Sequence, residues 1–187
     1  MRYTAYLFVN LSCMVRRVTY SRFAFNLRRT TDCYTLFSAR KAIGMNREMY
    51  VPPGGPPQTP PPSREIYPVM GEKNIFKMLE DFYLLLEKSS IRDMFPADMV
   101  AASEKSAAFF VGLLGGPPLY HQRYGSPMLR ARHLPFPIDD QARQVWLDCF
   151  DQILDQAVEE YDFPGEHLPG FRNFLHGFST WMVNKQS

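Results

Sequence analysis

The segment PMLRARHLPFP, residues 127–137, decides the fold of this 187-residue chain. It contains a histidine, His133, two residues before Pro135, and a proline disfavours α-helical geometry in the residue that precedes it. We therefore expect a short helix from about Pro127 that ends at His133, with Leu134 outside the α region. An imidazole at such a helix end either caps the helix or is held rigidly to bind a ligand.

This short helix belongs to a long irregular link, residues 115–138, with three glycines and five prolines. A loop of this length inside a compact domain is usually functional, for instance in holding a ligand. Around the link, apolar residues at helical spacing predict four longer helices. We expect them over residues 72–88, from the N-cap Asp98 to 114, from Asp139 or Asp140 through 157, and from about Pro169 to 182.

The apolar faces of these helices combine small residues with bulky aromatic ones. Ala102 and Ser106 lie on the face of the second helix, where a simple bundle would favour leucine. The other faces are rich in phenylalanine, tyrosine and tryptophan. Small residues opposite large rings favour a cavity for a flat ligand, although mixed sizes also occur in packed cores. No alternating strand pattern is present, so residues 66–187 are expected to form an all-α domain.

Charge and cysteine content exclude several classes of protein. The net charge is +2, but residues 1–47 contain nine basic residues and one acidic residue, so the remainder is mildly acidic. That balance argues against nucleic acid as the main partner. The three cysteines are far apart and form no CxxC, so neither a zinc site nor a disulfide framework is indicated. No apolar run is long enough to insert into a membrane.

The N-terminal third differs from the rest in composition. Residues 1–44 are rich in arginine, serine and threonine, which is typical of a mitochondrial-type transit peptide. The alternative is that Met45 or Met49 is the true start; without an organelle signal the protein is expected to be cytoplasmic. We expect this basic extension to be disordered.

Residues 45–65 form a proline-rich linker, expected to be polyproline II or disordered, with a domain boundary near residue 65. Pro57 and Pro60 make a PxxP that could dock an SH3-like domain, although a stiff, solvated linker is the commoner explanation.

His133 is an isolated candidate metal ligand. The other histidines, His121, His167 and His176, form no cluster with it, which makes a zinc or di-iron site unlikely. A lone histidine can still bind the iron of a haem, because the porphyrin supplies four nitrogen ligands. Neighbouring arginines could then pair with the haem propionates. On position alone, an ordinary helix-end histidine is the commoner case.

The stretch GGPPLYHQRYGSPMLRARHLPFPIDDQARQVWLDCF, residues 115–150, resembles the group II truncated haemoglobins of the bacterial-like globin family. The matching features are the GGP after the second helix, the G-x-P-x-L-R-x-R-H-x-P-F segment, and a tryptophan thirteen residues after its histidine. DFYLLLE, residues 81–87, resembles the first long helix of the family, including its tyrosine. The resemblance covers about residues 64–187.

The resemblance implies a truncated globin, a two-over-two helical sandwich whose B, E, G and H helices are the four long predicted helices. It implies haem b as cofactor, with His133 as the proximal iron ligand. Tyr83 and Trp146 match hydrogen-bond donors to the bound gas, and Ala102 falls where many globins place a distal histidine. Further haem contacts are implied for Phe95, Phe109 and Phe110, with Arg132 and Tyr120 as candidates for the propionates.

Two positions depart from the family pattern. The spacing from Tyr83 to Phe95 is one residue shorter than usual, which leaves the alignment over residues 88–93 open. Ser106 stands in the distal pocket where leucine is frequent, and its hydroxyl could donate a hydrogen bond or hold a water. Tyr83 and Trp146 also lie on apolar helix faces, where an aromatic side chain by default packs in the core.

The function implied by the resemblance is reversible binding of O₂, and of CO or NO, at a ferrous iron. Two hydrogen bonds to O₂ would slow its release, which suits sensing, scavenging or redox chemistry better than bulk oxygen transport. The first alternative is a nitric oxide dioxygenase or peroxidase-like enzyme; it would need a separate reductase, because the chain has no flavin or nicotinamide motif. The second is a non-haem helical interaction domain with a PxxP tail. A monomer or a homodimer is expected.

Overall fold

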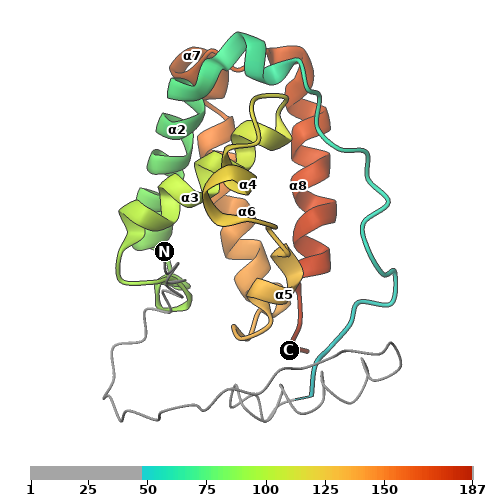
Figure 1. Cartoon of the computed structure of the whole chain (residues 1–187). Helices are drawn as coiled ribbons and strands as arrows, with labels where there is room; N and C mark the ends of the chain where they lie inside the picture. The colour runs from blue at the N-terminus through green and yellow to red at the C-terminus, as the bar shows by residue number, and fades with distance from the viewer. Residues whose placement is uncertain (1–47, 187) are drawn as a thin grey trace, which may run out of the picture. The chain divides into compact units, whose positions relative to one another are not determined.

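The computed structural model describes residues 48–186, which contain helices and no strands (Figure 1). The predictions for residues 1–44 lie outside this range. In chain order the elements are α2 (Ile66–Glu87), η1 (Arg92–Met94), α3 (Met99–Leu113), α4 (Leu119–Tyr124), α5 (Leu129–His133), α6 (Asp140–Leu154), α7 (Ala157–Tyr161), η2 (Gly165–His167) and α8 (Leu168–Met182). In the described part of the chain, no helix is long and apolar enough to cross a membrane.

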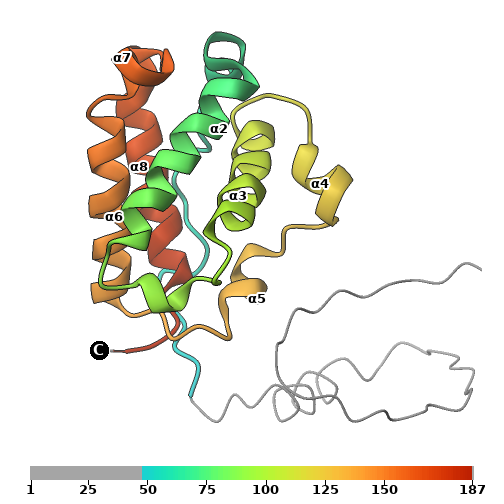
Figure 2. The ribbon, with the colours of Figure 1, turned by 90° about the vertical axis from the view of Figure 1, so that its left-hand side faces the viewer.

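The four long helices form two pairs. Helix α2 packs against α3, α6 packs against α8, and α2 also contacts α6, which joins the pairs (Figure 2). The predicted all-α fold and its two-over-two arrangement are therefore confirmed. The short helices α4 and α5 lie in the link between α3 and α6; α4 packs against α3, and α5 contacts α8 (Figure 2).

The predicted helix limits agree with the structure, with two differences. The first helix begins at Ile66 rather than residue 72, but the chain kinks at Gly71, where φ is 69° and ψ is 172°. Glycine adopts this conformation at low cost, so the regular helix does begin after it. The caps are Asp98, which accepts from the Ala101 N–H, and Asp139, which accepts from the Ala142 N–H. The third predicted helix is divided, because α6 ends at Leu154 and α7 begins at Ala157.

Helix α5 ends at His133 as predicted, but the reason given for that end is wrong. Leu134 has φ −57° and ψ −33°, inside the α region, and its N–H still bonds the Arg130 carbonyl at 3.1 Å. The helix ends because Pro135 has no N–H for the next helical hydrogen bond. The chain then turns back, with the Phe136 N–H bonding the His133 carbonyl.

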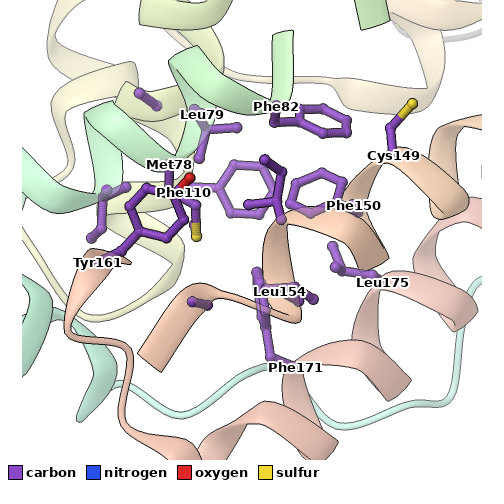
Figure 3. Packing of buried hydrophobic residues seen from close by; sticks show 14 of the residues in the cluster. Met78, Leu79, Phe82, Phe110, Cys149, Phe150, Leu154, Tyr161, Phe171 and Leu175 are labelled. Atoms are coloured by element: carbon purple, nitrogen blue, oxygen red, sulfur yellow. The ribbon is translucent and has the colours of Figure 1, made fainter. Parts of the chain in front are cut away.

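Aromatic rings form the core where the four long helices meet (Figure 3). The Phe150 ring lies 3.9 Å from that of Phe82 and 5.8 Å from that of Phe110, measured between ring centroids. Phe171 of α8 completes the group from the fourth helix. Full burial of each such side chain contributes roughly 1.5–3 kcal/mol, so this cluster fixes the relative positions of the helices that surround the site.

Residues 48–65, called the strap below, contain no helix or strand and run beside α8 (Figure 1). The strap is not fully solvated, as a free linker would be, because Pro52 and Pro62 are buried against the helical domain. The Tyr50 N–H bonds the Asn184 carbonyl at 3.1 Å. Of the PxxP residues, Pro60 is exposed and Pro57 is half-buried.

Candidate functional site

A cavity of about 290 Å³ opens between α2, α3, α5, α6 and α8. One ordered water needs only about 10–15 Å³ by the same measure, so this space is far larger than a packing defect. Its walls are mainly apolar. Small and aromatic residues line it together, as the sequence predicted, and it collects most of the predicted site residues: Tyr83, Phe95, Ala102, Ser106, Phe109, Phe110, His133 and Trp146.

The His133 ring is fixed in one tautomer. Its Nδ1 lies 2.7 Å from the Leu129 carbonyl oxygen, one helical turn earlier in α5. A carbonyl can only accept, so Nδ1 carries the proton and the neutral ring keeps a lone pair on Nε2. Within residues 48–186, Nε2 has no hydrogen-bond partner, and the ring lines the cavity. This is the arrangement in which a histidine binds a metal, its second nitrogen donating to a carbonyl.

No group of three metal-binding side chains accompanies His133 in the described part of the chain. A metal site built from protein ligands alone normally uses several such side chains. A single imidazole beside a large apolar cavity fits a cofactor that brings the remaining ligands itself. Haem is such a cofactor, since its porphyrin contributes four nitrogens and a flat apolar surface.

Tyr83 and Ser106 meet in the same cavity. Their hydroxyl oxygens lie 2.6 Å apart, and either can be the donor. Burial raises the pKa of Tyr83, while the hydrogen bond with Ser106 acts in the opposite direction and is the smaller effect. The phenol therefore stays protonated at neutral pH and retains a proton that it can donate.

Trp146 presents a second donor. Its ring packs edge-on against Phe82 at 5.7 Å and lies 4.7 Å from Phe150, which anchors the indole to the aromatic core. Its indole N–H has no acceptor among the described residues, although the side chain lines the cavity. Trp146 is half-buried, so a ligand that fills the cavity and accepts a hydrogen bond would give this N–H a partner while removing it from water.

Phe95 reaches the cavity despite the short spacing from Tyr83. Its ring lies 6.0 Å from that of Tyr83 in an edge-to-face contact. The single turn η1 brings it there, because the Arg92 guanidinium bonds the carbonyls of Phe95 and Pro96, each at 3.2 Å. Although the spacing between them is one residue short, Phe95 and Tyr83 therefore lie on the same wall of the cavity.

Two residues predicted to contact haem do not line this cavity. Arg132 is exposed, and its guanidinium donates to the carbonyls of Pro127 and Ser126 just before α5. Tyr120 is buried next to the lining residue Phe109, with ring centroids 6.0 Å apart, and its ring lies 5.2 Å from that of Tyr124. Their contacts with propionates stay predictions.

Other lining residues were not recognised as part of a site. Phe174, Phe178 and Met182 of α8 line the cavity, and their spacing predicted an apolar face without distinguishing core from pocket. Arg143 of α6 lines it too, with its Nε bonded to the Ser179 hydroxyl at 3.0 Å. No sequence signal indicated Arg143, because a charged residue on a helix normally faces solvent.

The fold and the site together define a truncated globin. The family described as bacterial-like globin matches residues 65–178, more than half of the chain, and the chain belongs to this family. It is 38% identical over 112 residues to the group 2 truncated hemoglobin YjbI of Bacillus subtilis (strain 168), covering 59% of this chain and 79% of that protein. It is 47% identical over 58 residues to two-on-two hemoglobin-3 of Arabidopsis thaliana, covering 31% and 33% respectively.

Solved structures show the same likeness. Phosphate-bound Hell's gate globin IV superposes with a TM-score of 0.64 at 33% identity, covering 70% of this chain and 81% of that one. The group II truncated haemoglobin from Bacillus anthracis gives a TM-score of 0.59 at 32% identity, covering 69% and 96%. This protein is thus a group II truncated haemoglobin by family, which implies that it binds haem and a diatomic gas.

Proposed function

We propose that this protein holds haem b through Nε2 of His133 and reversibly binds O₂, with CO and NO as further ligands. The observation that carries the proposal is the His133 ring itself: Nδ1 is bonded to the Leu129 carbonyl and Nε2 is left free at a large apolar cavity. The proposed role of the protein is sensing, scavenging or redox chemistry rather than bulk oxygen transport.

Haem would supply a ferrous iron able to bind a diatomic gas, and Nε2 of His133 would hold that iron. The Leu129 carbonyl holds His133 in the required tautomer and makes Nε2 a better electron donor. The phenylalanines that line the cavity would pack against the porphyrin and exclude bulk water. Ala102 leaves the space beside the gas open, because its side chain is a single methyl group.

Tyr83 and Trp146 supply the hydrogen bonds that select O₂ over less polar gases. A hydrogen bond from either residue to an acceptor with negative charge, as O₂ would be at this site, contributes about 1.5–3 kcal/mol. Each 1.4 kcal/mol corresponds to a factor of ten, so two such bonds would slow O₂ release by roughly two orders of magnitude or more. Slow release suits a sensor or a scavenger, since a carrier must unload its gas.

The test is the visible absorption spectrum of the full chain mixed with haemin, beside the same chain carrying His133→Ala. A sharp Soret band that shifts on reduction and on addition of CO supports the proposal. In the variant that band should be lost or altered, and free imidazole, which can take the place of the missing side chain, should restore it. A broad spectrum of unbound haemin in both proteins would refute the proposal.

A further inference from the structure

Helix α5, which carries His133, is not held in place by burial. None of its five residues is buried, and a helix of this length has no stability of its own. It begins after Met128, whose φ of 38° lies in the left-handed region. The ring of His133 is fixed to α5 by the Leu129 carbonyl, so the position of that ring in the cavity depends on what fixes α5 to the rest of the protein.

The first fixed point is Arg130, one turn before His133 on α5. Its guanidinium stacks on the ring of Trp181, 4.1 Å from the centroid, and donates to the Trp181 carbonyl at the end of α8. The same group donates to the carbonyl of Tyr50 in the strap at 3.1 Å. One planar side chain thus ties α5 to two segments that lie 51 and 80 residues away along the sequence.

The second fixed point is Asn184, just beyond α8, which is only 1% exposed. Its Nδ2 donates to the His133 carbonyl at 3.1 Å, and its Oδ1 accepts from the Ile138 N–H at 3.2 Å. Its own backbone carbonyl accepts from the Tyr50 N–H. This one residue therefore joins the end of α5, the residue just before the N-cap of α6, and the strap.

From these contacts we infer that Arg130 and Asn184 are positioning residues for the proximal ligand His133, and we call the pair the proximal clamp. The inference rests on the proposed function, since it concerns how His133 is presented to haem iron. Asn184 and its partner Tyr50 both lie outside the matched family segment, residues 65–178. The clamp thus draws the strap and the C-terminal residues of this chain into the haem site.

The sharpest variant is Asn184→Asp in the full chain. The carboxylate keeps the size of the side chain and an acceptor for Ile138, but it cannot donate to the His133 carbonyl. The matched control is Lys185→Ala, the next residue, which is exposed and whose ammonium contacts Asp139 instead.

The second variant is Arg130→Lys, since an ammonium cannot reproduce the stacked, forked contacts of a guanidinium. Its control is Arg123→Lys on the exposed face of α4.

Two readouts separate positioning from plain stability. The first is the iron–imidazole stretching frequency of the ferrous, gas-free protein by resonance Raman spectroscopy. The second is the rate of haem transfer to an excess of an apoglobin acceptor. Both variants should shift the stretch and speed haem loss by about tenfold or more, the usual effect of removing an outer partner of a metal-bound histidine. Both controls should match the wild type.

The outcomes distinguish the two proposals. If the wild-type protein shows no iron–imidazole stretch, the proposed function fails and the clamp fails with it. If the wild type shows the stretch and the folded variants keep its frequency and the rate of haem loss, only the clamp is refuted. The same holds if a variant lowers the melting temperature of the protein without moving the stretch, because that outcome indicates a structural role alone. If Asn184→Asp does not fold, the comparison of Arg130→Lys with its control Arg123→Lys tests the clamp instead.

Discussion

The hydroxyl oxygens of Tyr83 and Ser106 lie 2.6 Å apart at the wall of the cavity, which joins α2 to α3 through one hydrogen bond. Each hydroxyl has a single proton, so Tyr83 can donate to a gas only while Ser106 acts as the donor to Tyr83. A serine at this position therefore assists the tyrosine, because a hydrogen bond received by a hydroxyl strengthens the one that it donates.

The double-mutant cycle of Tyr83→Phe and Ser106→Ala tests this relationship. We expect Tyr83→Phe to speed O₂ dissociation at least about tenfold, from the loss of a bond worth about 1.5–3 kcal/mol. Ser106→Ala should give a smaller increase, and the double variant should match Tyr83→Phe alone, because Ser106 acts through Tyr83. Stopped-flow measurement of O₂ off-rates decides the point. Additive effects would show instead that Ser106 contacts the gas directly.

Trp146→Phe tests the second donor. The phenylalanine keeps an aromatic ring against Phe82 and Phe150 but removes the indole N–H. We expect the O₂ off-rate to rise about tenfold or more, with a much smaller change for CO, which accepts hydrogen bonds poorly. Both rates can be measured on the same preparation by ligand displacement. An equal change for both gases would mean that the indole acts by its shape and not by its N–H.

Gly177→Ala and Gly170→Ala form a matched pair on α8 that tests the strap. A β-carbon at Gly177 would lie 2.6 Å from Thr59 Cγ2 in the strap, whereas one at Gly170 would meet nothing within 4 Å. Alanine favours a helix over glycine by roughly 1 kcal/mol, so Gly170→Ala should raise the free energy of unfolding. Gly177→Ala should lower it by about 1–3 kcal/mol through overpacking. Urea unfolding of both variants gives the comparison, and a stabilised Gly177→Ala would show that the strap does not pack there.

Tyr161 predicts a dependence of stability on pH. Its hydroxyl donates to Asp81 at 2.8 Å, and burial together with the nearby carboxylates raises its pKa above the ordinary value. The folded state thus disfavours loss of this proton, and the unfolded chain releases it first, at about pH 10. The stabilisation is complete below pH 10 and falls as the pH rises above it, by at most about 1.4 kcal/mol per pH unit.

The measurement is the free energy of unfolding between pH 8 and about pH 11 for the wild type and for Tyr161→Phe. The variant should be less stable at neutral pH, because it lacks the bond to Asp81, and its stability should decline less steeply at high pH. Parallel curves would contradict the assignment of this decline to Tyr161.

The sequence predicted most of the fold because the signals involved are local. The periodicity of apolar residues located α2, α3, α6 and α8, and Asp98 caps α3 as expected. The break between α6 and α7 was missed, since Ala157 still falls on the same apolar face. The end of α5 was predicted correctly for the wrong reason: a proline's missing N–H and its effect on the preceding residue both indicate a helix end, and the sequence cannot separate them.

The sequence by itself thus determined the helices, their caps, the lone histidine at the end of a short helix and the mixture of small and aromatic residues around a cavity. These properties depend on residues a few positions apart. Only the tertiary structure decided that Arg143 rather than Arg132 lines the cavity, and that Asn184 and the strap hold α5. The bonds from Asn184 to His133 and from Arg130 to Tyr50 join residues 51 and 80 positions apart in the sequence. A local sequence pattern cannot predict them, because packing of the core decides where two distant segments meet.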